Sequence, residues 1–135
     1  MELRAFAEQV LRSTHLEDKL FSPSSFTDHH AGAAWTGPAQ PGRPTFLPLA
    51  PTRPIPPTPS PHQLEEDTVR GQALHTFAHH ELQALELMAL ALLRFPAAPT
   101  GFRLGLARII CDEQRHFELY RDRAEHWGVG LGDVG

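Results

Sequence analysis

The clearest pattern in the sequence is a helical repeat of apolar residues through two long stretches of its second half. A step of about 100° per residue places one group of apolar side chains on a single side of residues 62–95 and another on a single side of residues 101–127. The first stripe comprises Leu74, Phe77, Ala78, Leu82, Leu85, Met88, Ala89 and Leu92. The second comprises Phe102, Leu106, Ile109, Ile110, Phe117, Tyr120, Ala124 and Trp127. The pattern predicts two long amphipathic helices.

The ends of these helices are marked by residues that favour helix starts and stops. Ser60 at the N-cap, Pro61 after it and Gln63 at the third helical position form a helix-start signal. Pro96 ends the first helix, because the residue before a proline disfavours the helical region. A turn of a few residues follows, and Thr100 can cap the second helix. Two long helices joined by so short a turn form an antiparallel hairpin, with Gly71 as a possible weak point in the first.

The remaining segments are shorter and less regular. Leu3, Phe6, Ala7, Val10 and Leu11 have helical spacing, and Thr14 with Glu17 matches a capping box for a second short helix over 16–21. Residues 22–61 contain most of the thirteen prolines, and residues 128–135 are rich in glycine. The chain therefore divides into short N-terminal helices (1–21), a proline-rich irregular segment (22–61), a helical hairpin (62–127) and a glycine-rich tail (128–135).

The proline-rich segment has two interpretations. One is a flexible linker. The other is a strap that lays Trp35, Phe46 and Leu47 on the helices, and we favour it because a free linker rarely carries such large apolar side chains.

Composition and charge narrow the class of protein. The chain has 135 residues, a net charge of −4 and no basic run, which argues against a nucleic-acid-binding surface. The one cysteine, Cys111, points away from Glu113 on its helix and suits a reducing compartment. No apolar run reaches the length of a membrane span, and the N-terminus carries no signal-peptide core, so we expect a cytoplasmic protein.

Three polar residues interrupt the apolar stripes. Glu81 lies within the first stripe, and Glu113 and His116, three residues apart, lie within the second. If the hairpin folds at Ala98, Glu81 is 17 residues before the fold, while Glu113 and His116 are 15 and 18 residues after it. With equal rise per residue the three reach the same height on facing helices.

A buried carboxylate needs a counter-charge or a metal. One Glu from one helix and Glu-x-x-His from the next are half of the ligand set of a two-metal carboxylate bundle. Oxygen and imidazole ligands suit iron or manganese, and zinc stays open as an alternative. The structural alternative is an ion pair of Glu81 with an arginine or with His116 inside a helical core.

The sequence gives weaker reasons to expect a role in metal binding for the other polar residues near the stripes. His75, His79 and Glu86 form a row at one edge of the first helix, either as a polar border or as groups that orient or replace metal ligands. Tyr120 is expected in the core with its hydroxyl bonded, and a redox or ligand-orienting role stays open. Asp28-His29-His30 could also bind a metal, although adjacent histidines in a loop are usually solvated.

The two helical motifs, His79–Leu87 and Asp112–His116, resemble an uncharacterised ferritin-like family, catalogued as domain of unknown function 455. The resemblance extends to four further stretches: Glu2–Glu8, Lys19-Leu20, Pro41–Pro44 and Leu74-His75. The chain looks like the family's N-terminal part and is distantly similar to the di-iron monooxygenase that hydroxylates a modified tRNA base. The resemblance implies a four-helix bundle with carboxylate-bridged metals, and it carries the ligand role onto Glu81, Glu113 and His116.

A complete bundle of this type has a second hairpin with another Glu and another Glu-x-x-His, and no such hairpin follows Trp127. We therefore expect either a homodimer or the missing C-terminal half of a longer protein to complete the site. The expected fold is all-α: a long antiparallel hairpin, half of a ferritin-like bundle, with a short N-terminal helix and an irregular strap.

Three functions follow from this expectation. The first is an O₂-dependent oxidoreductase or monooxygenase of unknown substrate, with two Fe (or Mn) ions per completed site; a tRNA substrate rests only on the distant analogy. The second is a truncated, inactive half-bundle that serves in structure or assembly. The third is iron storage with ferroxidase activity.

Overall fold

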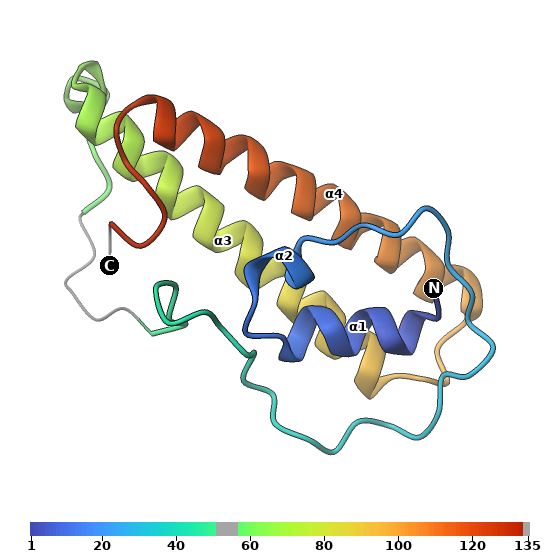
Figure 1. Ribbon diagram of the computed structural model, residues 1–135. Coiled ribbons are helices and arrows are strands. Elements are labelled where there is room, and N and C mark those ends of the chain that lie inside the picture. Colours follow the sequence, from blue (N-terminus) through green and yellow to red (C-terminus); the bar gives the residue numbers. More distant parts are fainter. Residues whose placement is uncertain (51–56, 134–135) are drawn as a thin grey trace.

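The fold is built from four α-helices and one 3₁₀ turn, described by a computed structural model over residues 1–50 and 57–133. The elements are α1 (Leu3–Arg12), α2 (Leu16–Lys19), the 3₁₀ turn η1 (Gln63–Glu65), α3 (Asp67–Arg94) and α4 (Thr100–His126). The long helices α3 and α4 run side by side as an antiparallel pair, and α1 lies against them near their connecting turn (Figure 1). Over the described residues there is no strand, so the predicted all-α class and helical hairpin are confirmed.

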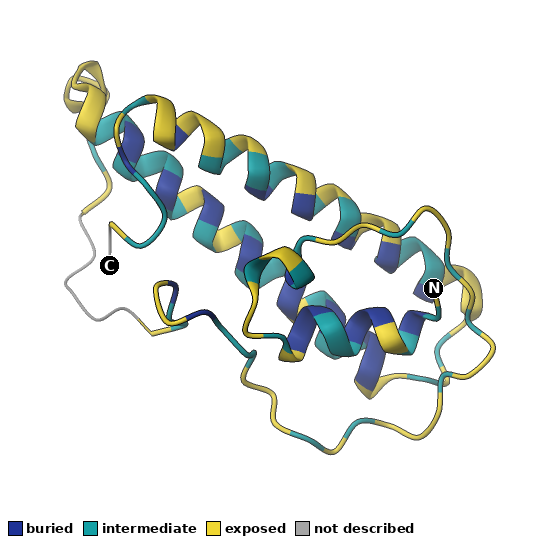
Figure 2. Cartoon of the chain, in the orientation of Figure 1, coloured by how far each residue is buried: buried dark blue, intermediate teal, exposed yellow. Residues whose placement is uncertain are grey.

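The contact between α3 and α4 uses one regular row of residues on each helix. Buried residues recur at intervals of four and three, and we call these two rows the inner seam. The inner seam comprises Ala78, Leu82, Leu85, Ala89 and Leu92 on α3, and Arg103, Ala107, Ile110, Gln114 and Phe117 on α4. Figure 2 shows these buried positions of the two helices along the line where they meet. Intervals of four and three are typical of helices that pack nearly parallel or antiparallel.

The buried side of α4 is rotated away from the stripe predicted for it. Phe102 and Ile109 are 62% and 46% exposed, and Phe77 on α3 is 48% exposed. Their predicted burial is wrong for this chain on its own. The apolar surface of each helix is wider than one neighbouring helix covers, so one part of it faces the partner and the rest stays open.

The helix-start signals are displaced by a few residues. Ser60 and Gln63 do form the predicted reciprocal hydrogen bonds, with Ser60 N donating to Gln63 Oε1 at 2.8 Å, but they precede η1, and α3 begins at Asp67. Thr100 is the first residue of α4 and Pro99 occupies its N-cap. Before α2, whose N-cap is His15, the Ser13 hydroxyl accepts from His15 N and donates to Asp18, and the predicted capping box of Thr14 and Glu17 is not formed.

The proline-rich segment is a strap over most of its length, as favoured from the sequence. It leaves α2 and passes around the turn end of the hairpin (Figure 1). Leu47 is buried, and Trp35 is half-buried, with its backbone N–H donating to Leu93 O at 2.9 Å. Phe46 is 50% exposed and is therefore less buried than Leu47 beside it. Residues 51–56 of this segment lie outside the described residues.

An ion pair fastens the strap to the hairpin turn. The buried Arg103 guanidinium binds the Asp28 carboxylate, with Nε–Oδ2 at 2.8 Å, and also donates to the carbonyls of Leu92 and Phe95. Those carbonyls belong to the C-terminal end of α3, where backbone acceptors lack helical partners. Arg103 thus joins α3, α4 and the strap.

The glycine-rich tail returns to the far end of α3 (Figure 1). Val129 is buried against Gly71, and Gly132 N donates to His75 Nε2 at 3.1 Å. Gly71 lies within an uninterrupted helix, so it is no weak point there. A Cβ on Gly71 would lie 2.5 Å from Val129 Cγ2, which explains why the helix has a glycine at this position.

Replacing Gly71 by alanine should therefore destabilise the protein, although alanine favours helix by about 1 kcal/mol. The clash with the branched Val129 side chain should outweigh that gain, with a net loss of about 1–2 kcal/mol. Chemical denaturation measures the change. Gly105→Ala is the matched control, because a Cβ there meets nothing within 4 Å, and it should be stabilising. Equal effects of the two substitutions would contradict this account of the tail.

No helix in the described part of the chain has the length and apolar character needed to cross a membrane.

Candidate metal centre

Three predicted residues meet on one side of the hairpin. Glu81 comes from the middle of α3, and Glu113 and His116 come from successive turns of α4. One ligand atom from each residue lies within 4.8 Å of the others. The common height predicted from the sequence is therefore present, because α3 and α4 are straight neighbours joined by a short turn.

The carboxylate of Glu113 is the most unusual group of the three. Its Oε2 atom is buried and has no hydrogen-bond partner, and the nearest cation-forming atom is His116 Nδ1 at 3.5 Å. A buried carboxylate oxygen without a hydrogen-bond donor lowers the stability of the folded protein by at least as much as the loss of one hydrogen bond. A bound cation would satisfy it.

The structural alternative of an arginine partner is not realised among the described residues. No lysine or arginine there forms an ion pair with Glu81 or Glu113. The other structural alternative was an ion pair between Glu81 and His116. In the structure the carboxylate next to His116 is that of Glu113, with Nδ1 and Oε2 3.5 Å apart. This leaves two carboxylates and one imidazole close together without a fixed positive charge, a donor set that fits iron, manganese or zinc.

Exposure differs along the cluster. The Glu113 side chain is 20% exposed and that of His116 is 45% exposed. Three protein ligands leave further coordination positions free on any of these metals, and the exposed side of the cluster is where additional ligands would enter.

Glu86 has a different partner from the one predicted. Its buried carboxylate binds Lys19 Nζ at 2.8 Å, and it takes two hydrogen bonds from Arg43, one of them from Nε at 2.7 Å. Lys19 also donates to the carbonyls of Val10 and Leu11, near the end of α1. Glu86 therefore joins α3 to α1, α2 and the strap, and its carboxylate is bound there by Lys19 and Arg43 rather than lying in the cluster.

His75 and His79 lie on the same side of α3 as Glu86. Burial lowers the pKa of both imidazoles, and for His79 the positive charge of Arg43 adds to the effect. His75 accepts its hydrogen bond from the tail, so it too has a structural partner away from the cluster.

Stability should depend on pH through His75. Its pKa is lowered from 6.5 because burial disfavours the charged ring, with Asp133 opposing the shift. The unfolded chain then binds the proton more readily, so stability is complete above pH 6.5 and falls as the pH drops below it, by at most about 1.4 kcal/mol per pH unit. Denaturation at about pH 7.5 and about pH 5.5 measures this slope. His75→Gln should reduce it and exposed His126→Gln should not; equal slopes in the two variants would refute the assignment.

Tyr120 and the Asp28-His29-His30 motif complete the candidates. Tyr120 is half-buried, and its ring contacts Phe77 with centroids 5.7 Å apart. Asp28 is bound by Arg103, while the backbone N–H groups of His29 and His30 donate to Glu2. The hydrogen bond from the Thr27 hydroxyl to Glu2, together with those from His29 N and His30 N, lowers the pKa of Glu2 to about 2. The Asp28 carboxylate and the backbone of the motif therefore serve to hold the strap in place.

Sequence reasoning missed the buried polar residues that organise this fold: Lys19, Arg43, Arg103 and Gln114. Gln114 lies in the inner seam and donates to the carbonyls of Lys19 and Phe21. A polar residue at a buried seam position is a signal of such a contact, but only the tertiary structure identifies the partner.

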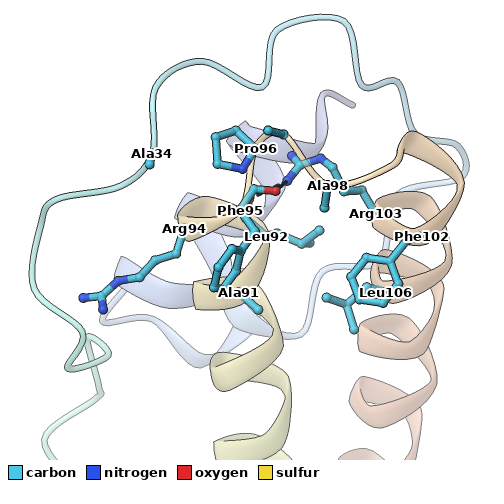
Figure 3. A pocket seen from close by; sticks show the side chains of 11 residues that line it. Ala34, Ala91, Leu92, Arg94, Phe95, Pro96, Ala98, Phe102, Arg103 and Leu106 are labelled. Atoms are coloured by element: carbon cyan, nitrogen blue, oxygen red, sulfur yellow. Dashed lines mark hydrogen bonds between the residues drawn. The ribbon is translucent and has the colours of Figure 1, made fainter.

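An apolar pocket of about 610 Å³ lies at the turn end of the hairpin. Phe95 and Ala91 from the α3 side and Phe102 and Leu106 from α4 line it (Figure 3). The pocket is separate from the cluster but lies on the same side of the two helices, since Leu106 precedes Glu113 by two helical turns.

The family model described as Protein of unknown function (DUF455) matches residues 3–135, almost the whole chain. The chain matches no curated protein and no solved structure.

Proposed function

The chain belongs to the DUF455 family of proteins of unknown function, and from that premise we propose that it binds iron or manganese through Glu81, Glu113 and His116 as one half of a ferritin-like two-metal carboxylate centre. The observation that supports this most directly is the buried Oε2 of Glu113, which has no hydrogen-bond partner and lies in a cluster with ligand atoms of Glu81 and His116. No lysine or arginine of the described residues pairs with that oxygen, and its ionisable neighbour is His116 Nδ1 at 3.5 Å, which the proposal makes a fellow ligand.

The three side chains have different roles in this proposal. Glu113 would be the bridging carboxylate, because its buried Oε2 has no hydrogen-bond partner and lies close to both of the other residues. Glu81 and His116 are terminal ligands. All three residues are partly buried, and partial burial strengthens the attraction between the carboxylates and a cation relative to bulk water.

Two redox-active ions, when bound, supply the capacity for O₂-dependent oxidation, and an oxidoreductase is therefore the activity that we propose for the completed site. The chain's own contribution is to hold two carboxylates and an imidazole in place on two packed helices, and to limit water at Glu113.

The test is the metal content of protein purified without chelator. We expect about one iron or manganese ion per chain, bound in a saturable way. No bound metal, together with no binding on titration with Fe(II) or Mn(II), would contradict the proposal and favour an inactive assembly fragment. Iron in large excess over two ions per pair of chains would instead favour storage.

A further inference from the structure

The apolar pocket at the turn end of the hairpin is bounded by segments that are far apart in the sequence. Its walls come from the C-terminal end of α3, the connecting turn, the first turns of α4 and the strap (Figure 3). The lining includes Ala34, Ala91, Leu92, Phe95, Phe102 and Leu106. Its volume of about 610 Å³ lies within the range of about 300–1,000 Å³ that is typical of small-molecule sites.

The walls of the pocket are held in place by polar contacts behind them. Arg103 is 2% exposed, donates to two carbonyls at the end of α3 and pairs with Asp28 of the strap. The strap is fixed a second time nearby, because Trp35 N donates to Leu93 O at 2.9 Å. A pocket whose walls are fixed in the free protein binds its ligand without the additional cost of ordering them.

Two aromatic rings flank the opening of the pocket. Phe95, which follows α3, is 64% exposed, and Phe102 on α4 is 62% exposed (Figure 3). Leu106, one turn further along α4, is half-buried. Removing such apolar surface from water is favourable, and the faces of aromatic rings pack well against other rings. The shape and lining therefore favour an apolar ligand.

The polar groups around the pocket already have partners or point elsewhere. All three guanidinium nitrogens of Arg103 donate to protein oxygens. In the turn, Phe95 N donates to Ala91 O and Ala98 N donates to Phe95 O. Arg94 also borders the pocket, but its guanidinium is directed away from the other lining side chains (Figure 3). A charged ligand would therefore lose its hydration here without gaining a partner.

We infer that this pocket is a binding site for a small, uncharged, apolar molecule, with an aromatic ring system as the kind that fits it best. The inference does not depend on the metal centre proposed above, because Glu81, Glu113 and His116 are not among the residues that line the pocket.

The experiment is a fluorescence titration of the 135-residue chain with two probes. One is N-phenyl-1-naphthylamine, which is uncharged, and the other is 8-anilinonaphthalene-1-sulfonate, which has the same ring system and a negative charge. We expect the uncharged probe to bind in a saturable way, with one molecule per chain. Its affinity should be at least about tenfold higher than that of the anion, because the sulfonate finds no counter-charge in the pocket.

Two substitutions test whether the probe binds in this pocket. Phe102→Glu places a carboxylate at the opening, and Ala91→Phe fills the space with a ring. Each should weaken binding of the uncharged probe by at least about tenfold. Ala91→Phe is the sharper test, because it adds apolar surface: a probe that only adheres to exposed apolar side chains would bind to that variant more strongly.

Each substitution has a matched control outside the pocket. Leu119→Glu makes the same change at another position of α4 that is 62% exposed. Ala84→Phe makes the same change at a half-buried position of α3, two helical turns before Ala91. Both controls should bind the probe as the parent chain does, and circular dichroism shows whether each variant is folded.

Sedimentation of the same samples shows whether a second copy of the chain fills the pocket instead. A dimer that does not bind the probe, and that Phe102→Glu separates into monomers, would overturn the inference. Equal affinity for the two probes would contradict the uncharged class of ligand. Binding that neither Phe102→Glu nor Ala91→Phe weakens, or that the controls weaken equally, would place the probe elsewhere and refute the site. A folded chain that binds neither probe would refute it as well.

Discussion

Replacing Glu113 by glutamine should abolish metal binding while leaving the metal-free protein as stable as before or more stable. The amide removes the charge and the preferred ligand oxygen but has nearly the same shape. Replacing a group that only orients a ligand typically weakens metal affinity by 10–100-fold, so loss of the bridging ligand should weaken it by more than about 100-fold. Because the Glu113 Oε2 has no partner in the metal-free chain, neutralising it removes a desolvation cost.

The measurement pairs Mn(II) titration with thermal unfolding of the metal-free protein. Asp112→Asn is the matched control: it removes the adjacent carboxylate on α4, which is 54% exposed and pairs with Arg115 at the surface. That variant should bind metal as the parent does. A Glu113→Gln variant that loses stability without metal would mean that the carboxylate has a structural partner, and it would contradict the metal site.

Replacing Glu86 by glutamine should have the largest effect on stability, about 3–5 kcal/mol. The side chains of Lys19, Glu86 and Arg43 are at most 5% exposed, and the carboxylate is the one anion between two cations. Burial already lowers the pKa of Lys19, which shows how poorly its charge is solvated there. Without Glu86 only backbone carbonyls remain to compensate Lys19.

Chemical denaturation measures this loss, and metal binding should survive it in the folded fraction because Glu86 lies outside the ligand cluster. The control is Asp67→Asn, which removes another ion-pair carboxylate from α3. Asp67 is 66% exposed, so its pair with Arg70 should contribute less than about 1 kcal/mol. If the two variants lose similar stability, Glu86 does not hold the strap and α2 to the hairpin.

The sequence predicted the hairpin well because its signals are local. Helical spacing of apolar residues and the Pro96 stop depend on neighbours within a few positions, and the height of Glu81 against Glu113 and His116 follows from counting residues along rigid helices. These features need no knowledge of distant contacts.

The side of each helix that is buried could not be predicted in the same way. A wide apolar stripe contains two neighbouring rows of residues. The sequence alone does not say which row packs against the other long helix and which remains exposed to solvent. Phe102 and Ile109 were therefore assigned to the wrong side. Glu86 was misjudged for a related reason: its partners, Lys19 and Arg43, are 67 and 43 positions away along the chain.

The ion pair between Asp28 and Arg103 spans 75 positions, and this separation affects how the protein folds during synthesis. Asp28 leaves the ribosome before α3 and α4 exist, and α1 packs more extensively on α3 than on any other helix. The first half of the chain consequently lacks most of its core contacts while it is being made. Nascent chains that end before α4 should stay open to proteases, and protection should appear in one step once Arg103 and the residues after it have emerged.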